Sequence, residues 1–258
     1  MTVKTFFIGL FASFGIPWLV LVAIPFSKMR SIEPVEYDEM ADGKTGFYQH
    51  KTSGRAQNGS IIYGQEGCAT CHSQVARPTY AGNDVHQNDL AGIAKDPERG
   101  NTRRESNLWD YSNEQYAWIG ETRIGPDLSN FGRRVEMLAH EHNKAAAEAL
   151  DVEVNALPQS KRFDAQKYVL TRLFNPRLVP HRDWSNCPSN RQFFTEKKVY
   201  GQGSANAIPV EGEEEGVEII ADDEAIALAD YLLSLKRDGE VPYSINYRRD
   251  KVKASEKK

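Results

Sequence analysis

The sequence Cys68-Ala-Thr-Cys71-His72 constrains this chain more than any other feature. Two thiols three positions apart, followed directly by a histidine, have the spacing for covalent attachment of a c-type haem. Each thiol would form a thioether with one vinyl group, and the histidine would supply an axial nitrogen to the iron. A zinc site would need a second pair of ligands, and Cys187 is the one other cysteine. The pattern therefore predicts one covalently bound haem c, held by Cys68, Cys71 and His72.

An apolar segment near the N-terminus predicts a membrane anchor. Residues 6–26 contain no charged side chain, and as a helix they would span about 32 Å, the thickness of a bilayer core. A cleaved signal peptide would have a shorter apolar region and a small-x-small cleavage site. Here Ser27-Lys28-Met29-Arg30 follows instead, which favours an uncleaved anchor over residues 1–30.

The haem motif predicts the side of the membrane, because haem is attached to c-type cytochromes outside the cytoplasmic membrane. We therefore expect a single-pass protein of the bacterial cytoplasmic (inner) membrane with its haem domain on the periplasmic side. Residues 31–55 have the composition of a connector, residues 56–240 form the haem domain, and residues 241–258 are a polar tail. The net charge of −4 gives no indication of nucleic-acid binding.

Several helices are predicted within the haem domain. A short helix over 59–66 precedes the cysteines, and residues 133–150 are rich in helix formers. Asp164 can cap a helix that runs to Phe174, and Asp222 or Asp223 can cap a final amphipathic helix. A helix before the haem motif and an amphipathic helix at the end are the frame of class I cytochromes c. The prediction is thus a mainly α protein: one transmembrane helix and a class I cytochrome c domain with a long insertion, over 73–124.

Four phrases of this sequence, in this order, resemble the monohaem cytochrome c subunit (subunit II) of cbb3-type cytochrome c oxidases. Together with the N-terminal anchor they cover most of residues 5–190. The phrases are Cys71-His72-Ser73-Gln74-Val75-Ala76-Arg77-Pro78, Gly125-Pro126-Asp127-Leu128 with Gly132, Asn175-Pro176-Arg177, and Ser185-Asn186-Cys187-Pro188.

The resemblance implies an electron relay in aerobic respiration. Such a subunit takes electrons from a soluble cytochrome or a further cytochrome c subunit and passes them to a polytopic haem–copper subunit in the membrane. It has no catalytic residues of its own.

The sixth ligand of the iron departs from the family pattern. In the family it is a methionine directly before a proline, and this chain has Cys187 at that place. Ligation by a Cys187 thiolate would lower the reduction potential by stabilising ferric iron. His181, six residues earlier, and Met137, the one methionine after the haem motif, are the alternatives, in that order.

Three further residues have expected roles around the haem. The resemblance implies that the Pro126 carbonyl accepts a hydrogen bond from the free N–H of His72, which would orient the imidazole. Arg77 and Arg123 could pair with the haem propionates, because a guanidinium suits a carboxylate.

Two other functions remain open from the sequence. The same plan of one anchor and one haem occurs in the cytochrome c subunit of nitric oxide reductases. A haem-based sensor or haem–thiolate enzyme is the third reading, because the expected methionine is missing. The acidic run over 211–218 is either a solvated loop or a docking site for a basic donor.

Overall fold

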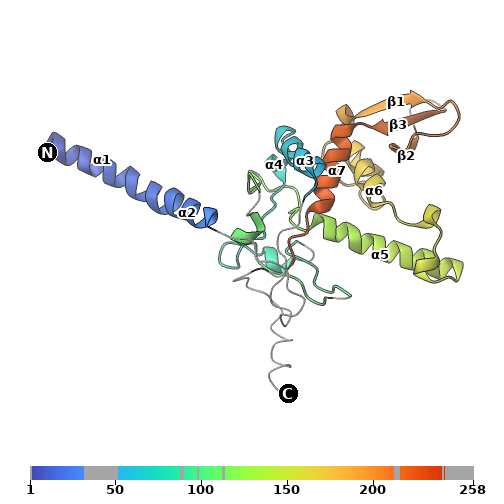
Figure 1. Cartoon of the computed structure of the whole chain (residues 1–258), viewed down its shortest axis with the longest axis horizontal. Helices are drawn as coiled ribbons and strands as arrows, with labels where there is room; N and C mark the ends of the chain where they lie inside the picture. Colours follow the sequence, from blue (N-terminus) through green and yellow to red (C-terminus); the bar gives the residue numbers. More distant parts are fainter. Residues whose placement is uncertain are drawn as a thin grey trace, which may run out of the picture. The chain divides into compact units, whose positions relative to one another are not determined.

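The computed structural model describes residues 2–31, 52–87, 90–97, 99–111, 114–211, 216–239 and 241. They fall into two compact units. One contains the N-terminal helix and residues 107–116; the other contains the haem motif and the remaining helices and strands (Figure 1). Most of the expected connector and of the polar tail lies outside the described residues.

The N-terminal unit consists mainly of one long helix. Helix α1 (Val3–Trp18) continues through a π-helical turn (Leu19–Ala23) into α2 (Ile24–Arg30). These 28 residues are long and apolar enough to cross a membrane, by length and composition alone, as a signal sequence also would be. The apolar helix is therefore confirmed, and it is longer at both ends than the predicted span over 6–26.

The second unit contains five helices and three strands in the described part of the chain. Short 3-10 turns connect several of them, and residues 73–124 are mostly irregular. The elements are α3 (Gly54–Gln65), α4 (Cys68–Cys71), α5 (Phe131–Leu150), α6 (Ala165–Phe174), β1 (Phe194–Lys198), β2 (Ala207–Glu211), β3 (Val217–Ala221) and α7 (Asp223–Ser234).

Side-chain caps explain where three of these helices begin. Asp164 accepts a hydrogen bond from a backbone N–H in the first turn of α6, and Asp222 does the same for α7, so both predicted caps are confirmed. Ser53 caps α3, which therefore begins at Gly54, five residues before the predicted start.

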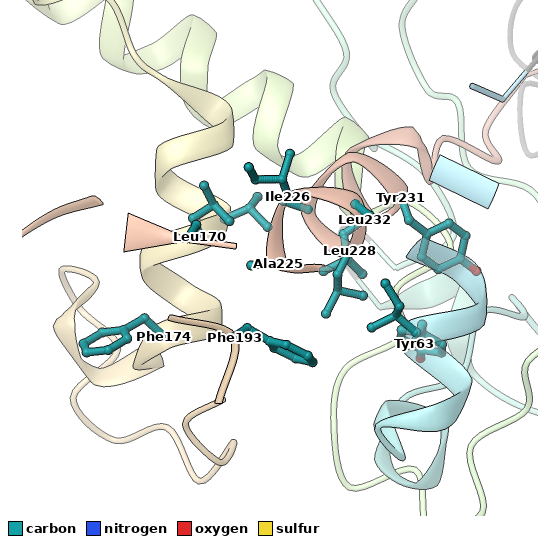
Figure 2. Close-up of a cluster of buried hydrophobic side chains, with 14 of the residues drawn as sticks. Tyr63, Leu170, Phe174, Phe193, Ala225, Ile226, Leu228, Tyr231 and Leu232 are labelled. Atoms are coloured by element: carbon teal, nitrogen blue, oxygen red, sulfur yellow. The ribbon is translucent and has the colours of Figure 1, made fainter. Parts of the chain in front are cut away.

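Helix α7 lies at the centre of the core. It packs against α3, α6 and α5, and Figure 2 shows Leu228 of α7 in the space between Leu170 of α6 and Tyr63 of α3. Because three helices cover it, α7 buries most of its circumference and not only the one face that its sequence pattern predicted.

Helices α3 and α7 approach so closely that only glycine fits at the crossing. A Cβ atom on Gly59 would lie 2.0 Å from the backbone oxygen of Ala227. Beside this contact the rings of Tyr63 and Tyr231 meet edge to face, with centroids 5.7 Å apart. The crossing fixes α3, and thereby the start of the haem motif that follows it.

A small antiparallel sheet, in the order β1-β3-β2, precedes α7. No strand was predicted there, so these three strands are an addition to a fold that is mainly helical, as predicted. Residues 211 and 217–218 of the acidic run belong to strands β2 and β3, and residues 212–215 lie outside the described part.

Candidate functional site

The two cysteines of the haem motif lie at the two ends of a single helical turn. Helix α3 ends at Gln65, and after Glu66 the residue Gly67 takes a left-handed conformation with φ of 71°, which suits glycine best. This turn of the chain starts α4, which runs from Cys68 to Cys71. Residues three apart on a helix lie on the same face, and both thiols are half-buried and unbridged.

The imidazole of His72 is held by the loop that contains Gly125 and Pro126. Its Nδ1 lies 2.8 Å from the Pro126 carbonyl oxygen. A carbonyl can only accept, so Nδ1 carries the proton and Nε2 keeps its lone pair. The structure therefore contains the hydrogen bond that was expected between these two residues.

Gly125 gives the ring its room. A Cβ atom at this position would lie 2.2 Å from Cε1 and 2.4 Å from Nδ1 of His72. The φ of Gly125 is not in the left-handed region, so the reason for glycine here is the contact with the imidazole and not backbone strain.

Backbone hydrogen bonds attach this loop to the haem motif. Donors on the loop bind carbonyls on and just after α4: Thr122 N to Thr70 O at 3.0 Å, Gly125 N to Cys71 O at 3.0 Å, and Leu128 N to Ser73 O at 2.8 Å. The position of Pro126 relative to His72 is therefore set by main-chain pairing. On the other side of the motif, the hydroxyl of Tyr63 donates to the His72 carbonyl at 3.0 Å.

Burial determines the protonation of the site. It lowers the pKa of His72, against the opposing effect of the hydrogen bond to Pro126. Burial, with the nearby thiol of Cys187, raises the pKa of Cys68 to about 11. At neutral pH the site thus presents a neutral thiol at Cys68 and a neutral imidazole at His72 whose Nε2 can bind a metal.

Cys187 is exposed on the loop after α6. Its thiol is close enough to those of Cys68 and Cys71 for their charges to interact. Burial raises the pKa of Cys187, and the guanidiniums of Arg172 and Arg177 oppose this shift. Cys187, the first candidate for the sixth ligand, is therefore brought near the motif.

The two alternative sixth ligands are placed differently. His181 is exposed on the same loop in a left-handed conformation, with φ of 62°, and its carbonyl accepts from the indole of Trp184 at 3.0 Å. Met137 lies within α5, about 200° around the helix axis from the core residue Val135. Because α5 is regular there, Met137 faces away from the core cluster.

Arg77 and Arg123, the expected propionate partners, both bind the buried side chain of Asp84. Arg77 makes a two-pronged contact, with Nε and Nη2 at 3.0 and 2.8 Å from the carboxylate oxygens. Arg123 Nη2 lies 3.1 Å from the same carboxylate. The charge of each arginine is thus already partnered within the protein.

Sequence reasoning missed two residues of this site. The sequence shows that Gly125 directly precedes Pro126. It does not show the contact between Gly125 and the imidazole, because that contact exists only in the folded loop. Arg172 of α6 acts electrostatically on both His72 and Cys187, and no local pattern marks it, because it is 100 residues from the haem motif.

In the part of the chain that the structure describes, no three His, Cys, Asp or Glu side chains come together as a site for a metal ion.

No protein-family model and no curated protein matches the sequence.

Proposed function

We propose that this chain is a membrane-anchored c-type cytochrome that relays electrons to the haem–copper catalytic subunit of a cbb3-type cytochrome c oxidase. The observation that carries the proposal is the state of His72: it directly follows two thiols on one helical turn, and its Nδ1 is bound to Pro126. This arrangement leaves Nε2 free to bind a metal. The hydrogen bond between Nδ1 and the Pro126 carbonyl fixes the orientation of the imidazole and therefore of Nε2.

The residues fit a covalently attached haem. The donor set is two thiols and one neutral imidazole, and Gly125 keeps the space beside the ring free of a side chain. A bound haem supplies a reversible one-electron couple at its iron. The chain contributes the two thioether sulfurs, the orientation of His72 through Pro126, and a nearby thiol at Cys187.

The assignment to an oxidase, rather than to another cytochrome, rests on the order of the four phrases and on the apolar helix. A helix of 28 residues with exposed apolar side chains needs either lipid or other membrane helices around it. In the proposed relay it packs against the polytopic subunit, with the haem domain on the periplasmic side. A soluble cytochrome or a further cytochrome c subunit is the donor.

The test is affinity purification of the tagged full-length chain from its native membranes, followed by mass spectrometry. We expect a haem–copper oxidase subunit in a stoichiometric amount. The matched control is residues 52–258 behind a cleavable signal peptide, which lacks the apolar helix and should retain less of the partner. Recovery of a nitric oxide reductase catalytic subunit would replace the proposed acceptor.

Recovery of the chain without any membrane partner would contradict the relay and favour the sensor or haem–thiolate enzyme. Binding of carbon monoxide to the reduced protein distinguishes the relay from the sensor or enzyme. An iron with both axial positions occupied, as in a relay, binds carbon monoxide poorly, whereas an iron with an open position binds it readily.

A further inference from the structure

Arg172 of α6 is a half-buried cation that acts electrostatically on two residues of the candidate site, His72 and Cys187. Its guanidinium carbon lies 5.2 Å from the centre of the Phe131 ring, and the guanidinium of Arg134 lies 5.8 Å from the same ring centre. Such contacts with an aromatic ring hold a guanidinium in place but do not neutralise its charge. Arg134 in addition donates to the Asp127 carbonyl at 2.8 Å.

The charge of Arg172 has no carboxylate partner among the described residues. The groups that act on it are the hydroxyl of Tyr168, the thiol of Cys187 and the guanidinium of Arg182. Burial and the repulsion from Arg182 both lower the pKa of Arg172. Holding a guanidinium away from water next to a second cation is unfavourable, so the pair favours an anion at this place.

The location of this cation narrows the choice of anion. Arg172 acts electrostatically on His72, the proposed axial ligand, and on Cys187, the residue at the family's second axial position. An anion bound by Arg172 is therefore close to the place of the haem. Arg77 and Arg123 are engaged with Asp84, which already supplies their counter-charge.

We propose that Arg172 forms a carboxylate-binding site that takes a propionate group of the haem. The proposal rests on the proposed function, because it requires a haem attached at Cys68 and Cys71. A guanidinium can donate two parallel N–H bonds to one carboxylate, which matches the two oxygens of a propionate. Arg172 is then a positioning residue for the haem and not a ligand of its iron.

The test is the propionate bending band in the resonance Raman spectrum of the full-length haem-loaded protein in detergent. Its frequency reports the hydrogen bonds that the propionates accept. Arg172→Gln should shift the band to lower frequency and lower the midpoint potential, because a positive charge near the haem is lost. Arg172→Lys keeps the charge but not the two-pronged contact, so it should shift the band while the potential stays near wild type.

Arg191→Gln is the matched control, because Arg191 is an exposed arginine whose guanidinium carbon lies 5.1 Å from the centre of the Phe174 ring, and it is not among the groups that act on His72 or Cys187. It should leave the band unchanged. If Arg172→Gln fails to load haem, Arg172→Lys decides the question. A wild-type band in every haem-loaded Arg172 variant would overturn the carboxylate site and leave the cytochrome intact. A wild-type chain without covalent haem would overturn both proposals.

Discussion

Replacing Gly125 by alanine tests how tightly the loop holds His72. The added methyl group would lie 2.2 Å from Cε1, 2.4 Å from Nδ1 and 2.8 Å from Nε2 of the imidazole. These distances are far below van der Waals contact, and the neighbour is a ring that cannot fold away. The ring must therefore move, which breaks its 2.8 Å hydrogen bond to the Pro126 carbonyl.

The magnitude follows from three terms. Overpacking costs about 1–3 kcal/mol, and a lost hydrogen bond costs about 1 kcal/mol. A Gly→Ala change at an unstrained position returns about 0.4–1 kcal/mol through the unfolded chain. The sum is a loss of about 1–3.6 kcal/mol, which for a domain of this size lowers the Tm by about 2–14 °C.

Thermal unfolding of the full-length protein in detergent, followed by circular dichroism, measures this shift. Gly54→Ala is the matched control, because Gly54 lies in the first turn of α3 and a Cβ there meets nothing within 4 Å. The control should unfold at or slightly above the wild-type temperature. If Gly125→Ala unfolds at the temperature of the control, the proposed close contact with His72 is wrong.

Three other changes give distinct outcomes. Gly59→Ala forces α3 and α7 apart at the Ala227 oxygen and should cost about 2–3 kcal/mol or more in urea denaturation; a smaller loss would mean that the helices can separate. Burial raises the pKa of Asp84, but hydrogen bonds from arginines such as Arg77 outweigh it, and the folded pKa lies below the usual value. Its contribution is thus fully present above about pH 4 and is lost as pH falls through the folded value. Asp84→Asn should therefore lower stability by about 3 kcal/mol at pH 7 and by progressively less as the pH falls below about 4; a loss that does not change as the pH falls would refute it. If Cys187 ligates the iron, Cys187→Met should raise the midpoint potential in a redox titration, whereas an unchanged potential and Soret band would exclude ligation.

Local signals predicted much of the helical structure. The starts of α6 and α7 could be read from Asp164 and Asp222 because a cap acts within three residues of its own position. The Cys-x-x-Cys-His motif was also visible as a short phrase of sequence, whereas the contact of His72 with Pro126, 54 residues away, was expected from the resemblance and not from a local signal.

Long-range contacts could not be read in this way. Strand β1 has the sequence Phe-Thr-Glu-Lys-Lys and is largely exposed, so it lacks the alternation that marks a half-buried strand; its pairing with β3 makes it a strand. The counter-charge of Arg123 is Asp84, 39 residues away, and nothing in the local sequence links the two. The same holds for Arg172, whose role depends on which groups the fold brings around it.

The most direct test of the account is whether the chain carries covalent haem through its two thiols. Membranes of the native host would be separated on a denaturing gel, stained for haem peroxidase activity, and compared with those from a Cys68→Ser, Cys71→Ser double variant. The account predicts a haem-stained band at the size of the wild-type chain, a pyridine haemochrome spectrum of haem c, and neither signal in the variant. A wild-type chain that is present in the membrane at normal levels without covalent haem would contradict it.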